Sequence, residues 1–191
     1  MSRQKIFLPL LPLILFFSHQ RSLAQSRLLS LQQVIAASGF IFSGKVIKVW
    51  SERDPASGFI VTSSTVAVED AVRGVVSKDH FTFKQYGGSY NGLNVFVADM
   101  SYFTEGEEVM VFLYPASVWG LTSPIGVSEG KLTIQRDPVT GKKFVFGNLL
   151  HMKMLAPHVD SPAMSPKAAP LMEYHDFIKL VREMAASGRQ Q

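Results

Sequence analysis

The chain has 191 residues, a formal net charge of +4 and no cysteine. The lack of cysteine excludes disulfides, thiol nucleophiles and every metal site that uses thiolate ligands. A chain of this length buries enough apolar surface to form one folded domain without covalent cross-links.

Residues 1–24 have the three parts of a secretory signal. A basic start that contains Arg3 and Lys5 precedes an apolar run at 6–17, and Ser22-Leu-Ala24 has the small-x-small form of a cleavage site. The apolar run is shorter than the roughly 20 residues that a membrane-spanning helix requires. We therefore expect cleavage after Ala24 and no stable membrane span in the mature protein.

Cleavage would change the charge balance and the expected class of partner. It removes three of the 19 basic residues and no acidic ones, which leaves 16 basic and 15 acidic side chains. A nucleic-acid partner would require a basic face, so we expect no nucleic-acid binding. A disulfide-free exported chain is typical of a bacterial periplasmic or extracellular protein.

A helical lead-in to the domain is expected over residues 25–38. Ser30-Leu-Gln-Gln33 has the form of a capping box, which predicts a short helix from about Leu31 to Ser38, ended by Gly39. Phe40–Trp50 then has the alternation of a strand. Gly44 stands where the apolar face changes sides, and a glycine at that point predicts a bulge.

Two segments share the pattern Arg-Asp-Pro-x-Ser/Thr-Gly, at 53–58 and 136–141. Aspartate accepts hydrogen bonds at the start of such a turn, proline presets the next backbone angle, and glycine takes the left-handed conformation. Both segments are predicted to be hairpin tips. The hairpins would pair 40–50 with 59–71 and 131–136 with 143–147.

Two further strands are predicted between these hairpins. His80–Gln85 alternates, with its phenylalanines inward, and Glu108–Tyr114 is apolar on both faces. The glycine-rich residues 87–92 are predicted to form a turn. Short strands separated by glycine predict an all-β domain over residues 39–147, folded as a small antiparallel barrel or sandwich.

The chain after this domain changes character twice. Residues 148–169 are rich in proline and methionine without any period, which predicts an extended linker. Residues 170–187 have helical spacing and predict an amphipathic helix that ends near Ala186 and covers one mouth or side of the barrel. Its apolar positions are Leu171, Tyr174, Phe177, Ile178 and Val181.

A possible metal site lies in the linker, where His151, Met152, Met154 and His158 are close together. Methionine sulfur suits Cu(I), and the two histidines would complete a copper or zinc site. The alternative, which we favour, is that the apolar members pack the linker on the barrel while both histidines lie in solvent.

Groups that commonly act in catalysis lack the required arrangement. The carboxylates at 69–70, 99 and 105–108 do not have the spacing of a known catalytic pair. Glu105 and Glu107 flank Gly106 in a predicted turn, so solvated loop charges are the favoured interpretation. No serine lies in a Gly-x-Ser-x-Gly motif, and His80 is interpreted as a structural residue at a strand edge. We therefore expect no enzymatic activity and no cofactor.

A binding surface is the remaining functional candidate. Tyr86, Tyr90 and Asn91 lie in or beside a glycine-rich loop and Trp119 lies in another, where amphipathic rings commonly anchor partners. Tyrosine and tryptophan are also ordinary half-buried residues of a barrel. Both interpretations remain open at this point.

Four segments together resemble a group of uncharacterised exported bacterial β-barrel proteins, which begin with a short helix: 41–47, 65–74, 103–113 and 126–132. Their order is more distantly similar to the OB-fold netrin-like domain of the tissue metalloprotease inhibitors, whose lysine-glycine step is matched by Arg73-Gly74. The resemblance covers about residues 30–147 and implies an OB-like (netrin-like) barrel. It is carried by glycines and apolar positions, which specify a fold better than an activity.

The inhibitors of that family chelate the zinc of their target through an amino-terminal cysteine, which this chain lacks. Their mechanism is therefore not transferred to any residue here. We predict an exported, non-catalytic binding or interaction module whose ligand is a protein or a component of the envelope. The resemblance to the inhibitor family further implies that the module modulates a secreted enzyme. The alternative is a periplasmic protein that handles copper or zinc through residues 151–158.

Overall fold

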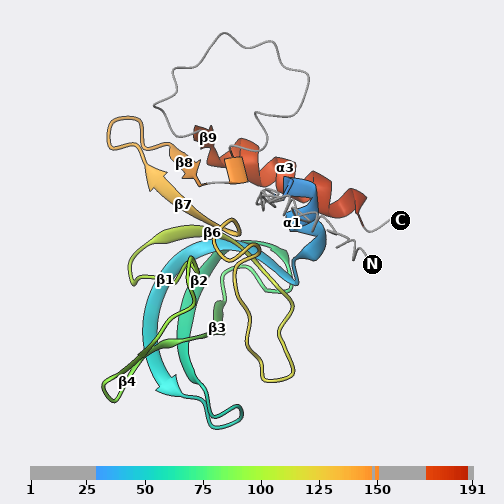
Figure 1. Ribbon diagram of the computed structural model, residues 1–191. Coiled ribbons are helices and arrows are strands. Elements are labelled where there is room, and N and C mark those ends of the chain that lie inside the picture. Colours follow the sequence, from blue (N-terminus) through green and yellow to red (C-terminus); the bar gives the residue numbers. More distant parts are fainter. Residues whose placement is uncertain (1–28, 148, 151–170, 189–191) are drawn as a thin grey trace, which may run out of the picture.

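A computed structural model describes residues 29–147, 149–150 and 171–188 (Figure 1). The predicted signal at 1–24 and nearly all of the predicted linker lie outside these residues. The described elements are α1 (Leu31–Ala37), β1 (Phe40–Arg53), β2 (Ile60–Arg73), β3 (His80–Tyr86), β4 (Gly88–Tyr90), β5 (Leu93–Val95), β6 (Glu108–Leu113), β7 (Lys131–Arg136), β8 (Lys143–Phe146), β9 (Leu171–Glu173) and α3 (Tyr174–Ser187).

Seven of these strands form one antiparallel sheet in the order β3-β2-β1-β6-β7-β8-β9, and β4 pairs with β5 separately. The prediction of a mostly β fold with helices near both ends is confirmed. Figure 1 shows α1 and α3 together on one side of the sheet, at the end opposite the β1–β2 turn.

The capping box that the sequence predicts is present at the start of α1. The Ser30 Oγ accepts a hydrogen bond from the Gln33 N–H at 3.2 Å, and Gln33 Oε1 accepts one from the Ser30 N–H at 2.9 Å. At the other end of the helix, Arg73 donates to the carbonyls of Ile35 and Ser38 at 2.7 and 2.9 Å. These bonds satisfy terminal carbonyls of α1 and attach the helix to β2.

The predicted bulge at Gly44 is confirmed. The pairing of β1 with β2 shifts register between Ser43 and Gly44, and also at two other places along the strand. A side chain at Gly44 would bring its Cβ within 2.1 Å of the Ala67 carbonyl oxygen, so only glycine allows this close approach. The bulges bend β1, which pairs with β2 along its length and with β6 over its first half.

Both predicted hairpin tips are also confirmed. The Asp54 N–H donates to the Phe59 carbonyl, and the Asp137 N–H donates to the Lys142 carbonyl, each at 2.8 Å. The glycine of each motif, at 58 and 141, has a positive φ of 73° and 70°. These turns join β1 to β2 and β7 to β8, as the shared sequence motif predicts.

Two hydrophobic cores cover the two faces of the sheet. Alternate residues of β6 enter different cores: Met110 and Phe112 face α1 and α3, whereas Val109 and Val111 face the concave side. The helix-side core also holds Leu149 and Leu150, at the start of the segment predicted as a linker. The concave-side core is rich in phenylalanine, with members Phe42, Phe83 and Phe103.

The predicted closed barrel is not found among the described residues. β3 and β9 end the sheet, and no strand pairing joins them. No ladder of the described sheet joins β3 to β6; instead, the loop after β6 makes one isolated bridge with each strand, Leu121 with Lys84 of β3 and Pro124 with Leu113 of β6. This loop, which leads from β6 to β7, contains Pro115 and Pro124, which have no N–H to donate to a ladder.

The C-terminal helix covers one side of the sheet, as predicted, but it begins later. Leu171–Glu173 pair with β8 as the edge strand β9, and α3 starts only at Tyr174. Phe177 and Val181 are fully buried in the helix-side core, while Leu171 is half exposed. None of the helices that the structure describes is both long and apolar enough to span a bilayer.

Candidate functional site

Three aromatic rings from three separate segments meet on the surface, and we call this cluster the aromatic tip. Phe59 follows the β1–β2 turn, Tyr86 ends β3, and Trp119 lies in the loop after β6. The Phe59 ring centroid lies 5.4 Å from that of Tyr86 and 5.4 Å from that of Trp119, with interplanar angles of 83° and 89°. Both contacts have the edge-to-face geometry that aromatic pairs prefer.

The rings of the aromatic tip remain open to solvent although they touch one another. Phe59 is 37 % exposed, Tyr86 39 % and Trp119 48 %. Beside them is a hollow of about 280 Å³, which we call the uncharged groove. It is lined by Tyr86, Met100, Tyr114, Pro115, Ser117, Leu121, Thr122 and Ser123.

A partly buried ion pair fixes the base of the aromatic tip. Asp54 Oδ1 accepts from the Lys84 ammonium at 2.6 Å, and Asp54 Oδ2 accepts from the Ser57 hydroxyl at 2.7 Å. The hydrogen bonds from Lys84 and Ser57 lower the pKa of Asp54 to about 2. The Lys84 carbonyl in turn accepts from the Thr122 N–H at 2.8 Å. The turn, β3 and the loop that carry the three rings are thus held together.

The structure brings together only two of the four predicted binding residues. Tyr86 and Trp119 meet through Phe59, which the sequence analysis missed although it directly follows a recognised turn motif. Tyr90 and Asn91 lie instead on the β4–β5 hairpin, with no ring contact or hydrogen bond to the aromatic tip. Asn91 and Gly92 both have positive φ, 48° and 78°, which defines a tight two-residue hairpin turn.

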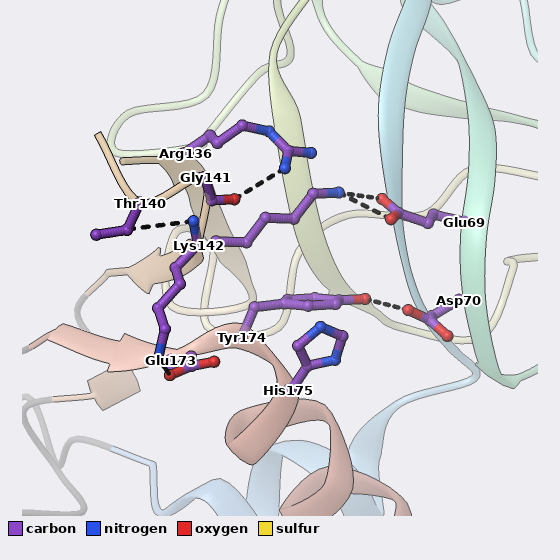
Figure 2. Close-up of a pocket in the computed structure, with 10 residues that line it drawn as sticks. Glu69, Asp70, Arg136, Thr140, Gly141, Lys142, Glu173, Tyr174 and His175 are labelled. Carbon is purple, nitrogen blue, oxygen red and sulfur yellow. Dashed lines mark hydrogen bonds and ion pairs between the residues drawn. The ribbon is translucent and has the colours of Figure 1, made fainter. Parts of the chain in front are cut away.

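A second hollow, of about 390 Å³, lies near α3, and we call it the charged groove (Figure 2). It is lined by residues of β2, of the β7–β8 hairpin and of the junction between β9 and α3: Glu69, Asp70, Arg136, Thr140, Gly141, Lys142, Lys143, Glu173, Tyr174 and His175. The Glu69 side chain is half exposed, and both it and Asp70 pair with side chains at this groove.

A chain of hydrogen bonds crosses the wall of the charged groove (Figure 2). The Tyr174 hydroxyl donates to Asp70 Oδ2 at 2.5 Å and lies 2.5 Å from the Ser43 hydroxyl. Because an ionised carboxylate only accepts, the proton of Tyr174 points to Asp70 and Ser43 donates to Tyr174. Arg182 donates to the other oxygen of Asp70 at 2.7 Å.

The protonation states of this chain of bonds follow from its surroundings. Burial and the bond to Asp70 raise the pKa of Tyr174 above its ordinary value. Burial acts to raise the pKa of Asp70, but the hydrogen bonds from Tyr174 and Arg182 outweigh it and the pKa is lowered. At neutral pH Tyr174 is therefore a neutral donor and Asp70 a charged acceptor, and both are satisfied within the protein.

Lys143 connects three strands on the same side of the molecule. Its ammonium lies 2.6 Å from Glu69 Oε2 and 3.1 Å from Glu108 Oε2. Burial acts to lower the pKa of Lys143, but the hydrogen bonds that its ammonium donates to Glu69 and its ion pair with Glu108 outweigh burial and raise the pKa. These ion pairs connect β8 to β2 and β6. We therefore interpret the polar contacts of the charged groove as structural, because they hold β8 and α3 to the rest of the sheet.

The predicted metal ligands, His151, Met152, Met154 and His158, lie outside the described residues. Within the part of the chain that the structure describes, no group of three or more histidine, aspartate or glutamate side chains is placed to hold a metal ion. The copper or zinc site stays a prediction from the sequence.

No protein-family model matches the chain, and searches of curated proteins and of solved structures give no match. Function is therefore inferred from the geometry of the described residues.

Proposed function

We propose that this chain is a non-catalytic interaction module that binds a partner protein through the aromatic tip. The observation that carries the proposal is that Phe59, Tyr86 and Trp119 meet on the surface while each stays at least 37 % exposed. Clustered exposed rings are typical of protein interfaces, where tyrosine and tryptophan supply much of the binding energy. The ion pair of Asp54 with Lys84 holds the rings in place before binding.

The curved part of the sheet supports a further element of the proposal, an incomplete OB-like barrel related in architecture to the netrin-like domain. β1 pairs with both β2 and β6, and two bridges link β3 to β6 through the loop. OB folds are partly open five-stranded barrels that bind ligands with one face and the neighbouring loops. The aromatic tip occupies such a loop end, and by analogy a secreted enzyme is one kind of partner.

The proposed location is the periplasm or the cell exterior. The support for it is the secretory signal that the sequence predicts at residues 1–24. A partner would then be another exported protein or a protein of the envelope.

Site-specific photo-crosslinking in cells that export the chain tests the proposal. A photo-crosslinking amino acid replaces either Val118, beside the aromatic tip, or Val139, at the tip of the β7–β8 hairpin. The two positions are matched, because both are valines in exposed turns, 95 % and 91 % exposed. We expect a defined protein adduct from position 118, reduced by Trp119→Ala, and none from position 139. Equal adducts at both positions, or none at 118, would contradict the proposal.

A further inference from the structure

We propose that the uncharged groove binds a proline-rich segment of the partner in the polyproline II conformation. This inference rests on the proposed function and narrows the partner from any protein to one that carries such a segment. Three properties of the groove lead to it: the charge of its lining, the hydrogen-bonding capacity of its rings, and the arrangement of those rings.

The lining of the groove excludes most strongly polar ligands. None of its eight residues is charged, and none carries a carboxamide. An ionic ligand would lose its hydration without gaining an opposite charge. A sugar would bring many hydroxyl donors to a surface that lacks carboxylate and carboxamide acceptors, and each unmatched donor weakens binding. The lining therefore favours a ligand that is apolar and has few donors.

The rings in and beside the groove carry hydrogen-bond donors that have no acceptor among the described residues. Within the described residues, the hydroxyl hydrogens of Tyr86 and Tyr114 and the indole N–H of Trp119 donate to no protein group; the Tyr114 oxygen only accepts, from the Gly126 N–H at 3.5 Å. The Thr122 hydroxyl, by contrast, already donates to the Tyr114 carbonyl at 2.6 Å, and the Ser117 hydroxyl accepts from the Leu121 N–H at 3.1 Å. Three free donors on apolar rings call for a ligand rich in acceptors.

A proline-rich peptide has this combination of properties. Proline contributes a carbonyl acceptor and an apolar ring but no N–H donor. In the polyproline II helix the carbonyls make no internal hydrogen bonds and are free to accept from a binding surface. The helix is largely formed before binding, so ordering it costs little entropy.

The ring arrangement also suits such a ligand. Tyr86 lines the groove and meets Phe59 edge to face, and Phe59 in turn meets Trp119 in the same geometry beside the groove. From Tyr86 the lining continues over Pro115 and Leu121 to Tyr114, which is 39 % exposed. Grooves with aromatic walls are the recurring means by which proteins recognise polyproline II segments.

Fluorescence anisotropy with a labelled ten-residue polyproline peptide and the purified chain tests the inference. We expect saturable binding of this peptide and none of a (Gly-Ser)₅ peptide. Tyr86→Phe and Trp119→Phe, which keep the rings and remove one donor each, should weaken binding about 3- to 10-fold, the net effect of one hydrogen bond. The matched controls Tyr90→Phe and Trp50→Phe should leave the affinity unchanged.

The outcomes separate this inference from the proposed function. If position 118 captures a partner but the polyproline peptide neither binds nor competes, the inference fails and the proposed function stands. Binding of chitohexaose or of phosphatidylglycerol vesicles in place of the peptide would overturn the inference in favour of a glycan or a membrane. Unchanged affinity in both phenylalanine variants would also overturn it. If position 118 captures nothing and no probe binds, both proposals fail.

Discussion

The β1–β2 turn, which Phe59 of the aromatic tip follows, and α3, which borders the charged groove, lie at opposite ends of the molecule (Figure 1). The polar groups of the two regions differ in how they are satisfied. In the charged groove, Tyr174, Asp70 and Lys143 bond to partners within the protein. At the aromatic tip, the hydroxyl of Tyr86 and the indole N–H of Trp119 have no such partner among the described residues. The difference shows that a groove lined with ionisable groups can stabilise the fold, because those groups already bond to one another. The unpaired donors of the aromatic tip remain available to a partner.

Changing one tyrosine to phenylalanine in each region should give the largest difference in the free energy of unfolding. Tyr174→Phe leaves the buried Ser43 hydroxyl without a partner and removes one bond to Asp70. We expect it to lower the free energy of unfolding by about 1–3 kcal/mol. Tyr86→Phe removes an exposed, unpaired hydroxyl, so it should change stability by less than about 0.5 kcal/mol. Urea denaturation of both variants measures the difference, and equal losses would refute the distinction.

The two Asp-Pro turns allow a second matched test. Asp54 Oδ1 is paired with Lys84 of another strand, whereas the Asp137 carboxylate bonds within its own turn, to Val139 and Thr140. Asp54→Asn should lower Tm by several degrees, on the order of 5 °C, because it weakens a link between separate segments. Asp137→Asn should lower Tm by about 1–2 °C, since it affects one exposed turn. Thermal unfolding followed by circular dichroism measures both Tm values. A larger loss of Tm in Asp137→Asn than in Asp54→Asn would contradict this account.

The pH dependence of the free energy of unfolding tests whether ionised Asp70 stabilises the fold at the charged groove. Burial acts against its charge, but Tyr174 and Arg182 lower its pKa below the ordinary value of 3.8, so folding favours the ionised form. This contribution is complete above the ordinary pKa and is lost as the pH falls through the lower pKa of the folded state.

Urea midpoints measured from pH 6 down to pH 2.5 test this expectation. The unmodified chain should lose stability more steeply than the Asp70→Asn variant once the pH falls below about 4. Asp176→Asn, which changes a carboxylate on α3 outside this chain of bonds, is the control and should keep the steep decline. Parallel curves for the unmodified chain and Asp70→Asn would show that Asp70 is not stabilised by the groove.

Local features of the fold were predictable because their causes lie within a few residues. The capping box at Ser30, the Asp-Pro-x-Ser/Thr-Gly tips and the bulge at Gly44 each depend on backbone geometry that neighbouring residues determine. The edge strand β9 was not predictable in the same way. It has three residues, too few for a period, and the spacing of Leu171 and Tyr174 also fits a helix.

The contacts of the two surfaces depend on residues far apart in the sequence. Lys143 pairs with Glu69, 74 positions away, and Tyr174 pairs with Asp70, 104 positions away. The residue types show that these side chains are polar. Only the strand order of the sheet shows that they lie opposite one another. The exposed rings of Tyr86 and Trp119 were predictable as candidates, whereas their meeting at Phe59 required the fold.

The affinity of the captured partner for two variants of the chain tests the central claim most directly. Trp119→Ala removes a ring of the aromatic tip, and Lys142→Gln removes an exposed charge of the charged groove that pairs with Glu173. Isothermal titration calorimetry should show a loss of affinity of about 30-fold for Trp119→Ala, the size typical of a central interface residue, and no change for Lys142→Gln. Loss of affinity in Lys142→Gln with full affinity in Trp119→Ala would place binding at the charged groove and contradict the account.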